Sequence, residues 1–211
     1  MGLFDKLFEK KTCDICGNNL GPEANIPLKD GVLCGKCARK LSPFSENISH
    51  NSIANIQNQL AYRKANKDKV VRFTTTRVLG SETKIYLDEN SHQFFVSSSP
   101  FWRETNPDIL DFSQIIGFDV EVRETKTEFY QTNQTKEQGF SQPSQQTNYE
   151  IYLSLRIDSP YFKEITFKVH DYLIEERNSV EFREAERRAN EICETLTELK
   201  ANQQHSNDFH S

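Results

Sequence analysis

Four of the five cysteines in this 211-residue chain fall into two pairs with the same spacing. Two residues separate Cys13 from Cys16 and Cys34 from Cys37, and seventeen residues lie between the pairs. This arrangement is typical of a zinc site, because each tight turn directs two sulfurs at one ion while backbone amides of the turn donate hydrogen bonds to them. Four cysteines fill the tetrahedron and leave no position for water or substrate. The spacing therefore predicts a structural zinc ion rather than a catalytic one.

Disulfide bonds and redox chemistry also use paired cysteines. Disulfides are rare in cytoplasmic proteins, and a redox pair normally stands alone beside a βαβ pattern, which this sequence lacks. An iron–sulfur cluster stays open as the main alternative to zinc. We therefore predict Zn²⁺ as a structural cofactor, with Cys13, Cys16, Cys34 and Cys37 as its ligands.

The residues between and after the cysteine pairs predict the elements that position them. Asp30-Gly31 separates two short apolar runs and indicates a hairpin between the pairs. After Cys37, residues 38–41 favour a short helix, because Pro43 follows closely and disfavours its continuation. Such a helix would aim its N-terminal amides at the thiolates and lower their pKa. The order of turn, hairpin, turn and short helix resembles a treble-clef or zinc-ribbon finger.

Four stretches of sequence also resemble a protein family. The opening MGLFDKLF, the first cysteine turn CDICG, the second DGVLCGKC and the following KLSPF are similar to those of a bacterial family of short four-cysteine domains of unknown function. The likeness covers about the first fifty residues. It implies a bacterial source and a zinc-binding module, and it implies no activity.

Two segments beside the cysteines carry apolar residues at helical spacing. Near the start of the chain, a single amphipathic turn is expected to pack on the finger or on a partner, with association at a membrane surface as the alternative. Its apolar residues are Leu3, Phe4, Leu7 and Phe8. A second helix is expected after Ser52, a suitable N-cap, and its apolar stripe consists of Ile53, Ile56 and Leu60. His50 is expected at the surface or in a cap, since the four cysteines already satisfy an ion.

Charge differs between the two parts of the chain. Residues 1–69 hold eleven Lys and Arg against seven Asp and Glu, a net charge of +4, whereas the remainder carries −9. A basic module can bind a polyanion, and Lys36, Arg39 and Lys40, with Lys10 and Lys11, would be the residues that contact phosphates. Four thiolates around Zn²⁺ carry a formal charge of −2, which the same side chains offset. Nucleic acid is therefore the less favoured partner.

From Val70 onward, apolar and polar residues alternate, which indicates antiparallel strands with one buried face. A hairpin is expected at residues 83–87 and 93–97. Residues 158–160 are expected to form a tight turn between the last two strands. Three further strands are predicted to bury alternate residues: Ile116, Phe118, Val120 and Val122; Ile151, Leu153, Leu155 and Ile157; and Ile165, Phe167 and Val169.

The end of the chain predicts a helix that closes this sheet. Its apolar residues recur in steps of three and four from Phe182 to Leu199, and Asn178 is expected to cap it. Residues 131–147, rich in glutamine, are expected to form a long loop. This order of elements resembles the pleckstrin-homology-like (PH-like) fold. The predicted class is α+β, with a zinc finger and its flanking helices at residues 1–69, a PH-like sheet domain at 70–201 and a disordered tail at 202–211.

No enzyme motif is present in the sequence, and no stretch is apolar enough to span a membrane. Cys193 and His170 are the one conceivable nucleophile pair, but a small thiol beside an apolar helix stripe is ordinary. Trp102 is expected to anchor a loop at the edge of the core. We predict a cytoplasmic, non-enzymatic zinc-binding adaptor with an unidentified protein partner. Nucleic-acid binding and membrane-surface association are the alternatives.

Overall fold

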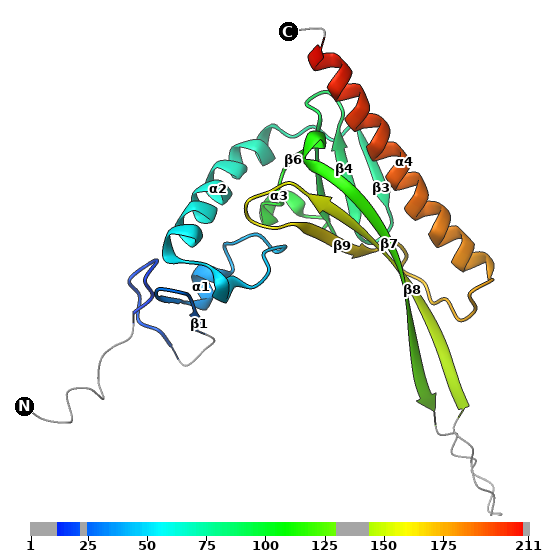
Figure 1. Ribbon diagram of the computed structural model, residues 1–211, viewed down its shortest axis with the longest axis horizontal. Coiled ribbons are helices and arrows are strands. Elements are labelled where there is room, and N and C mark those ends of the chain that lie inside the picture. Colours follow the sequence, from blue (N-terminus) through cyan, green and yellow to red (C-terminus); the bar gives the residue numbers. More distant parts are fainter. Residues whose placement is uncertain (1–11, 22–24, 130–143, 209–211) are drawn as a thin grey trace, which may run out of the picture. The chain divides into compact units, whose positions relative to one another are not determined.

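The computed structural model describes residues 12–21, 25–129 and 144–208, which form two compact units (Figure 1). The finger unit consists of Met1–Phe73, Phe101–Ile109 and Ser159–Lys163. The sheet unit consists of Thr74–Pro100, Leu110–Asp158 and Glu164–Ser211. A single boundary at residue 69 or 70 was expected, whereas two short segments from later in the chain belong to the finger unit. The apolar turn at Leu3–Phe8 and most of the loop at 131–147 lie outside the described residues.

The finger unit contains a small hairpin after its first cysteine turn, as the sequence predicted. Its strands β1 (Ile26–Pro27) and β2 (Val32–Leu33) pair antiparallel. Helix α1 (Gly35–Ala38) starts before Cys37 rather than after it. The other helices in the described part of this unit are η2 (Ile48–His50), the long α2 (Ile53–Arg72) and α3 (Trp102–Thr105).

Helix α2 is capped by two side chains. Ser52 Oγ accepts the N–H of Asn55 at 3.2 Å, and Asp30 Oδ1 from the hairpin turn accepts the N–H of Ile53 at 2.7 Å. The bond from Asp30 ties the start of α2 to the hairpin turn between the cysteine pairs. The expected cap at Ser52 alone would not make this connection. The helix runs through Arg72, so the strands do not begin at Val70. Val70 is instead buried on the helix.

The described residues of the sheet unit form two antiparallel sheets and one long helix. The first sheet has the order β3 (Arg77–Gly80), β4 (Lys84–Asp88), β5 (Gln93–Ser97) and β6 (Leu110–Asp111), followed by η3 (Phe112–Gln114). The second sheet has the order β7 (Ile115–Phe129), β8 (Ser144–Ile157) and β9 (Glu164–Lys168). These assignments confirm the predicted hairpin and the predicted strand around Phe167.

Strand β7 departs from the predicted burial pattern. Ile116 is 60% exposed and Val120 is 40% exposed, although both were expected to be buried. β7 is an edge strand that pairs only with β8 in the described part of the chain. Pairing is irregular between Ile115 and Gly117, so Ile115 is the residue that turns inward. The alternating residues of β8, from Ile151 to Ile157, are fully buried as predicted.

Helix α4 (Val180–Asp208) packs against this sheet unit (Figure 1). Its N-cap is Ser179, whose Oγ accepts the N–H of Phe182 at 3.1 Å, and not Asn178. The helix continues through Asp208, so residues 202–208 are helical rather than a disordered tail. Its buried residues follow the predicted stripe: Phe182, Ala185, Ala189, Ile192 and Leu196.

Candidate metal centre

The sulfurs of Cys13, Cys16, Cys34 and Cys37 lie together, all within 4.8 Å of one another. The Sγ atoms of Cys16 and Cys34 are 3.7 Å apart. A tetrahedral zinc ion with Zn–S distances of about 2.3 Å holds its sulfurs about 3.8 Å from each other. The predicted ligand set is therefore brought together at a spacing that suits one ion. The backbone holds this arrangement by ordinary hydrogen bonds within the finger.

The first cysteine turn is closed by its own backbone. The N–H of Gly17 donates to the carbonyl oxygen of Cys13 at 2.8 Å, and the N–H of Cys13 donates to that of Asn18 at 2.9 Å. Gly17 has a φ of 71°, a left-handed conformation that glycine adopts without steric cost. Asp14 fastens this turn to β2, because its Oδ2 accepts the N–H of Val32 at 2.6 Å. These bonds fix the shape of the first cysteine turn.

The hairpin glycine is needed for space. A Cβ atom at Gly31 would lie 2.6 Å from Asp14 Oδ2 and 2.7 Å from Ile53 Cδ1. The first cysteine turn, the hairpin and the start of α2 all meet at this point. The glycine of the predicted turn therefore serves the packing around the metal centre as well as the hairpin.

The second cysteine turn forms the start of α1. The N–H groups of Cys37 and Ala38 both donate to the carbonyl oxygen of Cys34 at 3.0 Å. The N–H of Cys34 donates to Cys13 Sγ at 3.3 Å, so the second turn supplies a hydrogen bond to a sulfur of the first. This bond is the kind that stabilises a thiolate.

Burial raises the pKa of the Cys13 thiol, but hydrogen bonds from the backbone of Cys34, Ile15 and Cys16 outweigh burial and lower its pKa to about 6. Burial raises the pKa of Cys37, and its contacts with the sulfurs of Cys16 and Cys34 raise it further. Cys13 is therefore more ready than Cys37 to meet an ion as a thiolate, and Cys37 must release a proton when metal binds.

The four sulfurs belong to the apolar core of the finger. Cys13, Cys34 and Cys37 are buried, whereas Cys16 is exposed. Around them lie the buried side chains of Leu28, Leu33, Leu41 and Ile56. An ion held here would have four protein sulfurs and an apolar surround, which leaves no room in the tetrahedron for a substrate.

Other candidate residues lie apart from this centre. His50 is exposed at the end of η2 and is not among the clustered ligands. His170 uses both ring nitrogens for backbone bonds: Nε2 accepts the N–H of Ile151 at 3.1 Å, and Nδ1 lies 2.8 Å from the carbonyl oxygen of Tyr172. It is therefore not placed to serve as a base for Cys193. Burial raises the pKa of Cys193, which disfavours a nucleophilic thiolate.

Trp102 is buried in the finger unit, where its ring contacts Phe73 edge-on with the centroids 5.9 Å apart. This agrees with the expected anchor of a loop. Lys36, Arg39 and Lys40 are exposed on and directly after α1. Lys10 and Lys11 lie outside the described residues.

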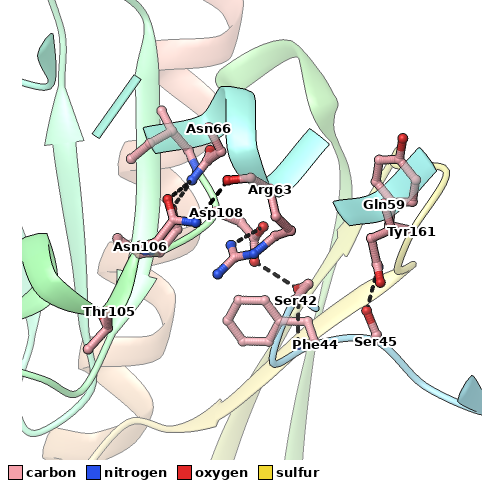
Figure 2. Close-up of polar contacts among 12 residues, drawn as sticks. Ser42, Phe44, Ser45, Gln59, Arg63, Asn66, Thr105, Asn106, Asp108 and Tyr161 are labelled. Atoms are coloured by element: carbon pink, nitrogen blue, oxygen red, sulfur yellow. Dashed lines mark hydrogen bonds and ion pairs between the residues drawn. The ribbon is translucent and has the colours of Figure 1, made fainter. Parts of the chain in front are cut away.

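A buried polar network in the finger unit was not predicted (Figure 2). Arg63 Nη1 donates to Asp108 Oδ1 at 2.7 Å, and Ser42 Oγ donates to Asp108 Oδ2 at the same distance. Asn66 Nδ2 donates to the carbonyl oxygen of Pro107 at 2.6 Å. The network joins α2 to the segment that follows α3, and every polar atom in it that we name has a partner, as burial requires.

The period of α2 was the signal that could have revealed this network. Its buried residues are Ile56, Gln59, Arg63, Asn66 and Val70, in helical steps of three and four. Ile56 and Val70, at the two ends of this stripe, are apolar, whereas the three buried residues between them are polar. A search for apolar residues at helical spacing therefore finds nothing between Leu60 and Val70. The partners, Ser42 and Asp108, lie far away in sequence and carry no local pattern.

The four sulfurs and their turns give the finger a four-cysteine cluster that could hold one metal ion. A family profile described as a domain of unknown function, DUF4428, matches residues 12–59. The match contains all four cysteines and the first part of α2. No curated protein and no solved structure matches the chain. Among the described residues, no helix is both long and apolar enough to cross a membrane.

Proposed function

We propose that this protein is a non-enzymatic, cytoplasmic adaptor that acts through protein–protein contacts, with a structural zinc ion in its finger. The observation that carries the proposal is the closure of the metal centre: four sulfurs within 4.8 Å of one another, three of them buried. Catalytic zinc keeps a position open for water or substrate, and this ligand set fills all four. The engaged nitrogens of His170 further support a role without catalysis.

The spacing of the sulfurs supports a single ion rather than an iron–sulfur cluster. A cluster inserts several iron and sulfide atoms between its cysteine ligands, so those ligands must lie farther apart than around one ion. The turns, hairpin and short helix support a treble-clef or zinc-ribbon finger. Four strands, then three, then a closing helix support a PH-like sheet unit. We extend the proposal to a bacterial source on the family resemblance alone.

Metal analysis and partner capture together test the proposal. Purified full-length protein is expected to carry one zinc per chain by elemental analysis. Protein partners from the native host should be retained by the wild type and lost with Cys34→Ser, and Cys193→Ser serves as the matched control outside the cluster. Iron in place of zinc, turnover of a substrate that depends on the metal, or full partner retention by metal-free protein would each contradict the proposal.

One observation favours nucleic-acid binding as a second candidate function. Lys36, Arg39 and Lys40 all expose their side chains within one short stretch of the finger. Phosphate contacts are made by such groups. The acidic remainder of the chain, at −9, opposes this function because it repels the same polyanion.

A further inference from the structure

Strand β7 leaves one of its two edges unpaired in the described part of the chain. From Gly117 to Phe129 it pairs with β8 on one side, and no described strand pairs with its other side. Within residues 119–127, every residue except the half-buried Val122 is exposed. The backbone N–H and C=O groups that point to this edge can therefore pair with another strand.

The start of β7 is closed to such a strand. Lys200 Nζ donates to the carbonyl oxygen of Ile115 at 2.6 Å, and the pairing with β8 is irregular between Ile115 and Gly117. Beyond this point β7 and β8 run on together past β9 as a two-stranded arm (Figure 1). The edge open to a partner thus begins at Gly117 and follows the arm.

Opposite charges flank the middle of this open edge. Glu121 and Arg123 stand on either side of Val122 and on the same face of the strand, and Arg123 Nη2 donates to Glu121 Oε2 at 2.7 Å. Their side chains are 52% and 46% exposed. The guanidinium of Arg123 also lies over the ring of Tyr152, 4.0 Å from its centroid. Both charges are therefore held in position where an added strand would meet them.

The pattern of charges along β7 is complementary to itself. In a two-fold antiparallel pair, opposed residues share a face of the sheet, so one residue must lie opposite its own copy. If that residue is Val122, Glu121 faces the partner's Arg123, and the symmetry forms this ion pair twice. The other opposed pairs from Gly117 onward are Val120 with Glu124, Asp119 with Thr125, Phe118 with Lys126, and Gly117 with Thr127. None of them brings like charges together.

Charge disfavours the neighbouring registers. Centring the pair one residue earlier or later sets Glu121 or Arg123 opposite its own copy. Centring it two residues later does the same to Glu124, and two residues earlier sets Asp119 against Glu121. Like charges directly opposite each other destabilise a strand pair. Val122 is also the midpoint of β7, so the register without repulsion is the one that pairs most of the strand.

We propose that two copies of this protein form a two-fold dimer in which their β7 edges pair antiparallel about Val122. The two three-stranded sheets then become one continuous sheet. The occupant of the edge is a second copy rather than an unrelated strand, because the charges of β7 match those of β7 itself in this register. The inference goes beyond the adaptor function and does not depend on it.

Sedimentation velocity of full-length, zinc-loaded protein over a range of concentrations tests the dimer. The wild type is expected to reach twice the monomer mass. Glu121→Arg and Arg123→Glu each set like charges opposite one another at two places. Each variant should weaken dimerisation at least about tenfold, because two attractive cross-strand pairs become repulsive. Both positions are exposed, so the circular dichroism of the variants should match that of the wild type.

A mixture of the two variants tests the register. In a mixed dimer, position 121 of each chain faces a position 123 of opposite charge, so the two variants should associate although neither dimerises well alone. The pair between positions 121 and 123 within each chain stays repulsive in the mixture, and its repair therefore cannot explain the recovery. Glu124→Arg is the matched control, because Glu124 would face Val120, and this variant should dimerise like the wild type.

Four outcomes would overturn the inference. The first is a wild type that stays monomeric up to sub-millimolar concentration. The second is a dimer that both single reversals leave intact, since another surface would then hold it. The third is failure of the two variants to associate when mixed, which would exclude the register about Val122. The fourth is equal loss of the dimer in Glu124→Arg, which would show a general effect of charge. Metal content and partner capture are measured separately, so none of these outcomes decides the adaptor proposal.

Discussion

The finger unit and the sheet unit bury different kinds of side chain. The core of the finger contains three cysteine sulfurs, and beside it lies the network of Arg63, Asn66 and Asp108. The sheet unit buries rows of isoleucine, leucine and phenylalanine from β4, β5, β8 and α4, with few polar groups among them. The stabilisation from apolar burial grows in proportion to the buried area. The stabilisation from metal ligands and buried ion pairs requires every partner to be present.

The two units should differ in how much stability they lose when one buried side chain is removed. Truncating one apolar side chain in the sheet unit leaves the rest of the core in place. Removing one ligand or one charge in the finger leaves the remaining partners buried and unsatisfied. The finger should therefore be the more sensitive unit to single substitutions at its polar positions, and Trp102, the one tryptophan of the chain, reports on it because its ring is buried there.

The largest effect is expected from loss of the metal. Cys34→Ser, or a chelator added to the wild type, should unfold the finger unit, because structural zinc contributes on the order of 10 kcal/mol to a small finger. Trp102 fluorescence should shift toward that of a solvent-exposed indole. Amides of β8 should keep their slow hydrogen exchange, since no metal ligand lies in the sheet unit's described core.

Cys193→Ser is the control, because Cys193 is a cysteine outside the cluster. It should retain metal and show the native Trp102 signal. If chelation also abolished the slow hydrogen exchange of β8 amides, the two units would not differ in their dependence on the metal, and this prediction would be wrong.

The next effect concerns the buried ion pair. Arg63→Met leaves the Asp108 carboxylate buried without its cationic partner, although Ser42 still donates to it, and breaking such a pair costs about 3–5 kcal/mol. Denaturant unfolding followed by Trp102 should move to lower denaturant, while metal content stays at the wild-type value. The double variant Arg63→Met/Asp108→Leu should recover much of the loss, because it removes both charges. A double variant as unstable as the single one would contradict this account.

The sequence predicted the metal centre better than the network beside it. Cysteine spacing is local, so Cys13, Cys16, Cys34 and Cys37 could be paired with an ion before any fold was known. Asp108 finds Arg63 only through the tertiary packing of a segment forty-five residues away. Polar residues on a helix read as exposed, so the sequence, which predicted this helix through Lys67, did not reveal its buried face beyond Leu60.

In the sheet unit, the strands were predicted, whereas the burial pattern along β7 was not. Alternation in β8 and β9 was correct because these strands have apolar neighbours on their inner face. The same alternation in β7 gave the wrong burial for Ile116, which lies where the pairing with β8 is irregular, and for Val120. The extra helical residues up to Asp208 are polar and carry no periodic signal.

A smaller effect on the free energy of unfolding, confined to the sheet unit, is expected when His170 becomes protonated. Burial lowers the pKa of this histidine below its ordinary value of 6.5, with Lys168 and Arg188 acting in the same direction against Glu150. The unfolded state then binds more protons below about pH 6.5, so the free energy of unfolding falls as pH drops, by at most about 1.4 kcal/mol per pH unit. Protonated Nε2 also loses the bond from Ile151.

Hydrogen exchange of β8 amides between pH 7 and pH 5, corrected for intrinsic rates, measures this loss. His170→Gln should be less stable at pH 7 but show a shallower pH dependence, because the titrating group is gone. An unchanged slope in the variant would assign the pH dependence to other residues of the sheet unit.

The smallest effect is expected from reversing the exposed charges of the finger. Changing Lys36, Arg39 and Lys40 together to Glu should alter the free energy of unfolding little, since exposed positions usually contribute within about 0.5 kcal/mol each. Zinc affinity should fall modestly, because the thiolate centre loses nearby positive charge. Binding of mixed DNA or RNA at physiological salt should be negligible for both proteins. If wild-type protein instead binds duplex DNA with a log affinity that falls by about 0.9 per phosphate contact against log salt, and the triple variant does not, the finger is a nucleic-acid module. The two units would then differ in partner as well as in core, and the adaptor proposal would give way to the second candidate.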